Sequence, residues 1–205
     1  MMHTTDEYTP WITILYTCFM LVFVPVYWYF YGAVNFLYFC DISLILTYIG
    51  IMTENKLFIS MSSVGIMIPQ TLWIADFIGT ACGKPLIHMT DYMFREDHLL
   101  LLRSLSLFHI WLPILLCCLV YKNGYDRRAA YLWTVFSSCI LILCYFITEP
   151  QDPSATGLAP RNINFVWGLG DTPQQLMHHD AWFAFVLLGS PVLIYYPTHY
   201  ILCGI

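Results

Sequence analysis

Two carboxyl groups and one imidazole lie inside long apolar stretches of this sequence, those of Asp41, Asp76 and His109, and the thiol of Cys40 is next to the first of them. An ionisable group is costly in lipid, so each one found there is a functional candidate. His109 belongs to the stretch 103–122, in which Pro113 follows four residues later. Proline has no N–H to donate to the carbonyl of His109, so we expect the helix to bend there and to leave that carbonyl free.

The residue types alone allow three kinds of chemistry. A buried aspartate and histidine can pair between helices and hold them together, which contributes about 1 kcal/mol. They can instead bind a ligand or exchange protons with a substrate, and an imidazole with carboxylates can also hold a metal ion. All three remain open at this point. Cys40 taken alone is equally typical of a cysteine that packs as a small hydrophobic residue.

The composition is that of a membrane protein. Of the 205 residues, 59% are hydrophobic and 10% are charged, and the mean hydropathy is +0.66. A soluble domain carries roughly 25% charged residues, so we expect the chain to cross a membrane several times. The net charge of −5 and the lack of a basic patch argue against a nucleic-acid partner. The eight cysteines contain no CxxC pair, which argues against both a disulfide framework and a thiolate metal site.

Hydropathy predicts an all-α polytopic membrane protein, a single integral domain over 1–205 built as a bundle of about six transmembrane helices. The spans are expected near 11–31, 33–52, 57–78, 103–121, 129–147 and 181–201. Two long loops on the same side of the membrane connect the third span to the fourth and the fifth to the sixth. The first of them, 79–102, is expected to lie in the interface as an amphipathic or re-entrant helix. In the second, the apolar patch 165–167 is expected to fold back onto the protein.

Two groups of residues predict how the first and third spans are placed. Aromatic residues at the end of the first span are expected to form a belt at the membrane interface: Tyr27, Trp28, Tyr29 and Tyr31. Small residues in the third span predict close packing between helices: Ser60, Ser62, Ser63 and Gly65. The eight basic residues divide evenly between the two sides, and we expect the short turn at 122–128 to be cytoplasmic because short loops follow the positive-inside rule best.

The order of the spans brings the ionisable residues together. With six spans, Asp41, Asp76 and His109 all lie about one or two turns below the face that carries both long loops. We therefore expect a polar cavity that opens to that side. Ser106 is one turn from His109 on the same helical face, and Gln70 is about two turns below Asp76 on its own helix. Both are candidate ligand-binding residues.

A second candidate for metal binding lies near the loop ends, where imidazoles and carboxylates occur together: His178, His179 and Asp180, with His88 and Asp91. These groups suit zinc or iron, but adjacent histidines point in different directions on a helix, and the spacing matches no known ligand signature. A bis-histidine haem would need two histidines at matched depth, and only His109 is clearly inside a span. The sequence therefore predicts no metal and no cofactor, and these residues are expected to bound the last span at the lipid interface.

Several blocks of the chain are similar to those of known families. From about Asn35 to Leu202 the chain resembles an uncharacterised bacterial family of membrane-associated proteins, through blocks such as SMSSVGIMIPQTLWIADF, RSLSLFHIWLP and NINFVWG. This resemblance implies a multi-pass protein of the bacterial inner membrane and brings no activity with it.

A more distant resemblance suggests an activity. The pattern is similar to YwaF-like integral membrane proteins and to the androgen-induced and androgen-dependent lipid hydrolases, in which a nucleophile on an early span is paired with a histidine on a later one. FLYFC corresponds to an LPLHLC-like phrase, which implies Cys40 as the nucleophile. FHIWLP likewise implies His109, and NINFVWG implies Asn164. Tyr38 stands where the LPLHLC phrase has its histidine, so the match is incomplete there.

Two functions follow as expectations. The first is a membrane-embedded lipid acyl-ester hydrolase or acyltransferase, in which Cys40 is the nucleophile, His109 is the general base, and Asp41 or Asp76 orients the imidazole. The second is a non-catalytic transmembrane subunit of a larger membrane complex, or a partner in it that binds lipid or a cofactor. The aromatic content of 18% fits the second function. Membrane lipids are the expected partners in both cases, and other membrane-protein subunits in the second.

Overall fold

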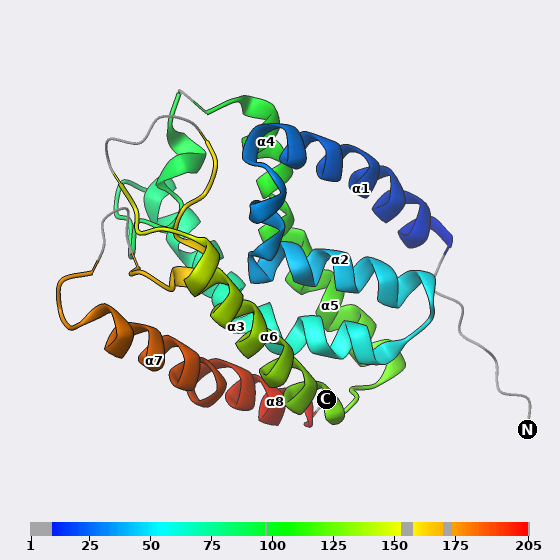
Figure 1. Cartoon of the computed structure of the whole chain (residues 1–205). Helices are drawn as coiled ribbons and strands as arrows, with labels where there is room; N and C mark the ends of the chain where they lie inside the picture. Colours follow the sequence, from blue (N-terminus) through cyan, green and yellow to red (C-terminus); the bar gives the residue numbers. More distant parts are fainter. Residues whose placement is uncertain (1–9, 97, 153–157, 170–173, 205) are drawn as a thin grey trace, which may run out of the picture.

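The computed structural model describes residues 10–96, 98–152, 158–169 and 174–204. Within these ranges all regular structure is helical, which confirms the predicted all-α class (Figure 1). The elements in chain order are α1 (Pro10–Tyr31), η1 (Ala33–Leu37), α2 (Phe39–Met52), α3 (Lys56–Ala81), η2 (Asp91–Phe94), α4 (Leu100–Ser106), α5 (Phe108–Asn123), α6 (Arg128–Ile147), η3 (Ile163–Phe165), α7 (His179–Ser190), η4 (Pro191–Tyr195) and α8 (Tyr196–Leu202).

Five segments of the described chain are long and apolar enough to cross a membrane, which agrees with a multi-pass protein: Pro10–Tyr31, Lys56–Ala81, Leu100–Asn123, Arg128–Ile147 and His179–Leu202. The second expected span differs from the prediction. Its first residues form the short turn η1, and α2 has 14 residues. A span needs about 20 residues, so α2 is too short to cross a bilayer alone.

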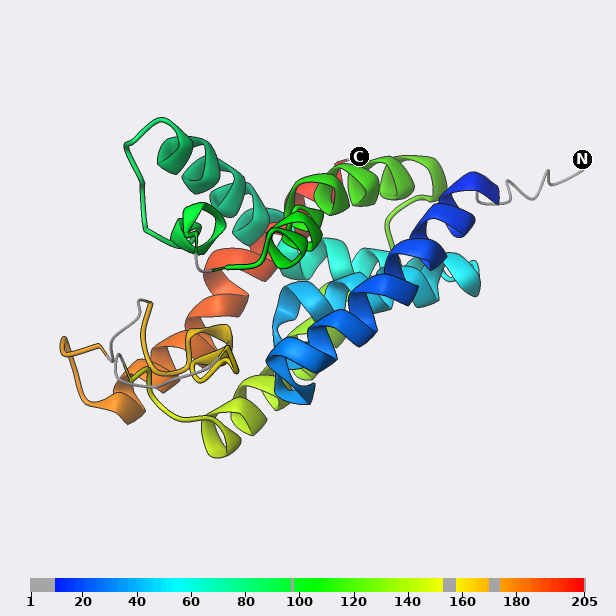
Figure 2. The same cartoon turned by 90° about the horizontal axis from the view of Figure 1, so that it is seen from above.

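The central helix is α3, which packs against α2, α5, α6 and α8. It begins where the side chain of Asn55 accepts a hydrogen bond from the backbone N–H of Leu57 (3.0 Å), a typical helix cap. In both views α1 lies at the outside of the bundle (Figures 1 and 2). The residues that α3 contributes to the interior therefore decide how most of the other helices are placed.

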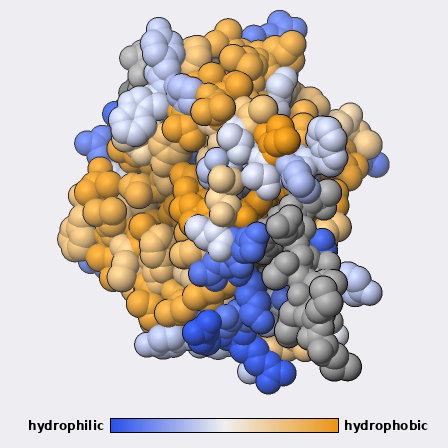
Figure 3. Space-filling model, turned by 90° about the vertical axis from the view of Figure 1, so that its right-hand side faces the viewer, coloured by the Kyte–Doolittle hydropathy of each residue, from blue (hydrophilic) through white to orange (hydrophobic). Residues whose placement is uncertain are grey.

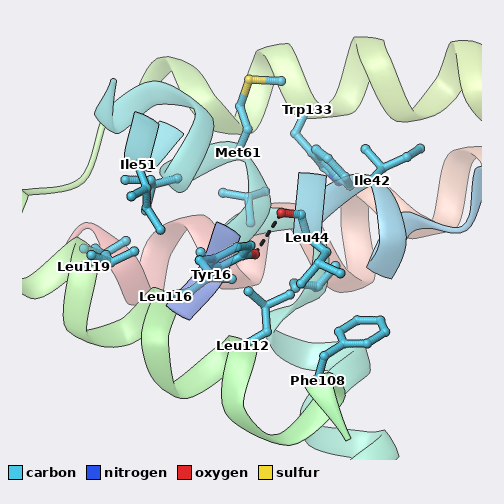
Figure 4. Close-up of a cluster of buried hydrophobic side chains, with 14 of the residues drawn as sticks. Tyr16, Ile42, Leu44, Ile51, Met61, Phe108, Leu112, Leu116, Leu119 and Trp133 are labelled. Atoms are coloured by element: carbon cyan, nitrogen blue, oxygen red, sulfur yellow. Dashed lines mark hydrogen bonds between the residues drawn. The ribbon is translucent and has the colours of Figure 1, made fainter. Parts of the chain in front are cut away.

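The small residues of α3 allow this close packing, as predicted. The Ser62 hydroxyl donates to the backbone carbonyl of Ser43 on α2 (3.1 Å). Gly65 lies so close to the buried ring of Trp133 on α6 that a Cβ atom there would be 2.2 Å from the ring. On the other side of the core, Tyr16 of α1 donates its hydroxyl proton to the carbonyl of Leu44 (2.8 Å), within the hydrophobic cluster of Figure 4.

The two long loops lie at the same end of the bundle, at the left of Figure 1. The expected interfacial helix over 79–102 is wrong: α3 continues to Ala81, and among the described residues that follow, only η2 is helical before α4 begins at Leu100. The physical reason is that the backbone N–H groups of Leu86, Ile87 and Thr90 donate to the Asp76 side chain of α3 instead of to backbone carbonyls four residues earlier. The second loop does fold back onto the protein, because Ile163 and Val166 are buried in a small cluster with residues of α6.

Large hydrophobic side chains remain exposed over much of the described surface, including those of α1, α6 and α7. Figure 3 shows one face on which hydrophobic residues predominate and hydrophilic residues gather toward one edge. Such a surface suits contact with lipid or with neighbouring membrane proteins.

Candidate functional site

Cys40 and Asp41 lie on the first turn of α2. The Cys40 thiol donates to Oδ1 of Asp41 (3.8 Å), and the Asn35 amide donates to Oδ2 of Asp41 (2.5 Å). The Asp41 side chain is buried, with 2% of its surface exposed, and no basic residue of the described chain pairs with it. The structure thus places Asp41 next to the thiol, whereas the sequence suggested that it would orient the imidazole.

His109 lies near the start of α5, where its ring is held on three sides. It stacks on Trp73 of α3, with ring centroids 4.7 Å apart, and on Phe108, at 4.1 Å. Nδ1 lies 2.8 Å from the backbone carbonyl of Ser106. A carbonyl only accepts, so Nδ1 carries the proton and Nε2 of the neutral ring carries the lone pair. Nε2 has no hydrogen-bond partner among the described residues, which leaves it able to accept a proton.

Ser106 connects His109 to α1. Its carbonyl accepts from the imidazole, while its hydroxyl donates to the carbonyl of Leu102 (3.1 Å). The Tyr27 hydroxyl lies 2.8 Å from the Ser106 hydroxyl. Since the single Ser106 hydroxyl proton is directed to Leu102, Tyr27 is the donor in this pair. Asp41 is close enough to Tyr27 to affect it electrostatically, so Tyr27 lies near both Ser106 and Asp41.

Tyr92 lies in the loop turn η2. Burial raises the pKa of the Tyr92 phenol above its ordinary value, and the nearby Cys40 adds to this effect, whereas interactions with Ser106 and Trp73 act in the opposite direction. Tyr92 therefore lies near both Cys40 and Ser106. We call the following residues the polar cluster: Tyr27, Asn35, Cys40, Asp41, Tyr92, Ser106 and His109.

Three members of the polar cluster were not singled out as site residues from the sequence: Tyr27, Asn35 and Tyr92. Tyr27 was assigned to the interfacial belt, yet only 5% of its surface is exposed, whereas Trp28 and Tyr29 are 60% and 81% exposed as expected for a belt. Tyr92 lies in a loop that was expected to be an interfacial helix. The available signal was the block DYMF, an aromatic pair in the middle of an amphipathic connection.

Asp76 lies below the first loop and is engaged by that loop alone. Oδ1 accepts from the backbone N–H groups of Leu86 and Ile87 (both 2.8 Å). Oδ2 accepts from the backbone N–H of Thr90 (2.9 Å) and from its hydroxyl (2.8 Å). Among the described residues no hydrogen bond joins Asp76 to His109. Asp76 therefore positions the loop that carries Tyr92.

Asn164 has the same kind of role for the second loop. Its side chain donates to the carbonyl of Leu37 (2.8 Å) and accepts from the backbone N–H of Phe39 (2.9 Å). These bonds fix the start of α2, and with it Cys40 and Asp41. Gln70, in contrast, is 2% exposed, and neither atom of its amide has a partner in the described part of the molecule.

Comparison with known proteins adds no identification. No family model, no curated protein and no solved structure matches this chain. The function therefore has to be argued from the polar cluster itself.

Proposed function

We propose that this protein is a membrane-embedded enzyme of the bacterial inner membrane that transfers or hydrolyses the acyl group of a lipid ester, with Cys40 as nucleophile and His109 as general base. The observation that supports this most is the state of His109. Its Nδ1 is fixed by the Ser106 carbonyl and its Nε2 is free, in a cluster that also contains the Cys40 thiol. A thiol in a weakly polar site is mostly protonated, so it needs a neighbouring base of this kind to form the reactive thiolate.

In the proposed reaction, His109 Nε2 takes the proton of the Cys40 thiol. The resulting thiolate attacks the acyl carbonyl of the lipid, a carbon–sulfur bond forms, and the ester carbon–oxygen bond breaks. The leaving alkoxide takes the proton back from the imidazolium, which leaves a thioester on Cys40. A water molecule or an acceptor alcohol then attacks the thioester with His109 again as base, which releases the acyl product and restores the thiol.

The charge of Asp41 affects how readily Cys40 forms a thiolate. A negative carboxylate 3.8 Å from the sulfur would oppose formation of a thiolate. The first step therefore requires Asp41 to be neutral, or to have a cationic group of the substrate next to it. No hydrogen bond joins Cys40 directly to His109 in the described part of the chain. Proton transfer therefore requires that substrate binding bring the thiol within hydrogen-bond distance of Nε2.

A second candidate function is supported by different residues. Asp76 bonds to the first loop, and Asn164 of the second loop bonds to η1 and the start of α2, as expected for polar residues that hold a membrane protein together. Exposed hydrophobic side chains cover α1 and α7. A non-catalytic subunit, bound to lipids and to other membrane-protein subunits, would have these features.

The deciding experiment is covalent labelling in native membranes with an alkyl fluorophosphonate and with a lipid-like thiol electrophile. The wild type is compared with Cys40→Ala and His109→Ala, and with Cys117→Ala as a matched control because Cys117 is an exposed thiol on α5. We expect labelling of Cys40 to be lost in the first two variants and retained in the control. If His109→Ala leaves the rate of Cys40 labelling unchanged, the enzyme proposal fails and the subunit proposal takes its place.

A further inference from the structure

Three potential metal ligands converge where α7 begins. The ligand atoms of His178, His179 and Asp180 all lie within 4.8 Å of one another. Nδ1 of His178 is 3.4 Å from Oδ2 of Asp180, and Nε2 of His179 is 3.2 Å from Oδ1 of the same carboxylate. No other group of three such residues is present in the described part of the chain.

These separations suit a tetrahedral metal site. Zinc binds imidazole nitrogen and carboxylate oxygen at about 2.0–2.1 Å, so two ligands of a tetrahedral ion are about 3.3 Å apart. The two nitrogen–oxygen distances fall on either side of that value, each to a different oxygen of Asp180, so a small movement of the side chains would bring three ligand atoms around one ion. Two imidazoles and one carboxylate are also the ligand types that favour zinc over magnesium or calcium.

The backbone explains why adjacent histidines can face the same point. On a regular helix, neighbouring side chains point about 100° apart, which was the objection raised from the sequence. His178, however, is the residue before the helix and has an extended conformation (φ −56°, ψ 143°), so it does not follow the helical spacing. Its ring lies 4.2 Å from that of His179, measured between centroids.

The Asp180 carboxylate also has a hydrogen-bond partner outside the three potential ligands. The Tyr145 hydroxyl, on α6, donates a short hydrogen bond to Oδ1 of Asp180. Tyr145 in turn stacks on Phe183 (4.2 Å) and on Trp167 (4.8 Å), so its ring is fixed by α7 and by the second loop. An outer partner that orients a ligating carboxylate is a regular feature of metal sites and supports metal affinity.

We propose that His178, His179 and Asp180 bind a divalent zinc-type ion, with Tyr145 as a positioning residue and the fourth coordination position open. All three ligands are exposed, so the open position faces the water at the membrane surface. The ion would join the start of α7 to the end of α6 through Asp180 and Tyr145. This site is independent of the polar cluster and of the acyl chemistry proposed for it.

The test uses the full chain, purified in detergent through a tag that contains no histidine. Bound Zn²⁺ is titrated by calorimetry, and Co²⁺ is used in parallel because a tetrahedral site gives it intense visible absorption. We expect one Zn²⁺ per chain for the wild type, and an affinity at least roughly tenfold lower for His179→Ala and for Asp180→Asn. Tyr145→Phe should weaken binding roughly tenfold while it leaves the Co²⁺ spectrum tetrahedral.

The matched control is His88→Ala. His88 and Asp91 form an exposed imidazole–carboxylate pair (3.0 Å), similar in chemistry but without a third ligand. This variant should bind Zn²⁺ like the wild type. Zn²⁺ binding that is absent from the wild type, or that is lost in His88→Ala and kept in Asp180→Asn, would overturn the proposal. Gel filtration and the thermal midpoint without metal show whether each variant is folded.

Discussion

The Asn164 side chain accepts a hydrogen bond from the backbone N–H of Phe39 (2.9 Å), although the two residues are 125 positions apart in the chain. Phe39 is the first residue of α2, so this bond satisfies one of the N–H groups that a helix start leaves free. The same side chain donates to the carbonyl of Leu37, in η1. One residue of the second loop thus fixes the turn from which Cys40 and Asp41 project.

Replacing Asn164 should therefore loosen α2 at its start. Asn164 has a left-handed backbone (φ 53°, ψ 28°), which glycine adopts freely and alanine does not. We expect Asn164→Gly to lower the free energy of unfolding by about 2 kcal/mol through the two lost hydrogen bonds, and Asn164→Ala by about 1 kcal/mol more. Denaturant titration in mixed micelles measures both. Equal effects of the two substitutions would show that backbone strain contributes nothing.

Gly65 should tolerate no side chain. A Cβ atom there would lie 2.2 Å from two ring carbons of Trp133, a residue with 0% of its surface exposed. We expect Gly65→Ala to lower the free energy of unfolding by about 3 kcal/mol, because the ring has no space into which it can move. Gly189→Ala is the matched control: its nearest neighbour would be 3.8 Å away, so it should be neutral or stabilise the protein by up to about 1 kcal/mol. A well-folded Gly65→Ala with an unchanged melting curve would contradict the packing described here.

The sequence predicts the spans and their order well because apolar length is a direct physical requirement of the bilayer. The same order places Asp41, Asp76 and His109 toward one face. It does not predict how each helix is rotated about its axis. α1 is apolar on all sides, so nothing in its hydropathy distinguishes the buried Tyr27 from the exposed Tyr29.

The sequence also does not predict the hydrogen-bond partners of these polar groups, because the partners lie in loops. Asp76 was expected to face His109, but it binds the backbone of residues 86–90. His178 was expected to point away from His179 because both were placed on one helix, yet the helix begins only at His179. In both cases the decisive factor is the local path of an irregular segment, which hydrophobic periodicity does not describe.

Asp76 should control the order of the first loop. Asp76→Asn replaces one accepting oxygen by an NH₂ group that would face two donors of the loop, so we expect a loss of about 3 kcal/mol in local stability. Hydrogen exchange at the amides of Leu86, Ile87 and Thr90 should become faster by roughly a hundredfold. Asp91→Asn, in the same loop but exposed, is the control and should leave these amides protected. Unchanged exchange in Asp76→Asn would show that the loop is held by other contacts.

The turn between α5 and α6 should make stability depend on pH. The Arg128 side chain donates to both oxygens of Asp126 (3.1 and 2.8 Å), and these bonds hold the pKa of Asp126 below its ordinary value. A lowered pKa in the folded state means that the stabilisation is complete above about pH 4, the value for an unfolded aspartate, and is lost as the pH falls toward the folded pKa. Thermal midpoints in detergent between pH 3 and 6 should show a smaller acid-induced drop for Arg128→Gln than for the wild type. An identical drop in both would exclude this pair as its source.

Asp41 should restrain the reactivity of Cys40. In its ionised form Asp41 places a negative charge beside the sulfur, which makes a thiolate less favourable, and this effect is strong where water is scarce. Asp41→Asn keeps the size of the side chain and an oxygen that can accept from Asn35, but removes the charge. We expect Cys40 to react with a lipid-like thiol electrophile at least roughly tenfold faster in this variant, since about 1.4 kcal/mol corresponds to a factor of ten.

The control for this prediction is within the same chain. Cys82 is exposed and lies after the end of α3, so its labelling rate should be the same in wild type and variant. If Asp41→Asn instead makes Cys40 react more slowly, then Asp41 accepts the thiol proton itself and His109 is not the base that activates Cys40. Repeating the measurement in His109→Ala separates the two roles, because only an imidazole base predicts that the faster reaction of Asp41→Asn is lost when His109 is also removed.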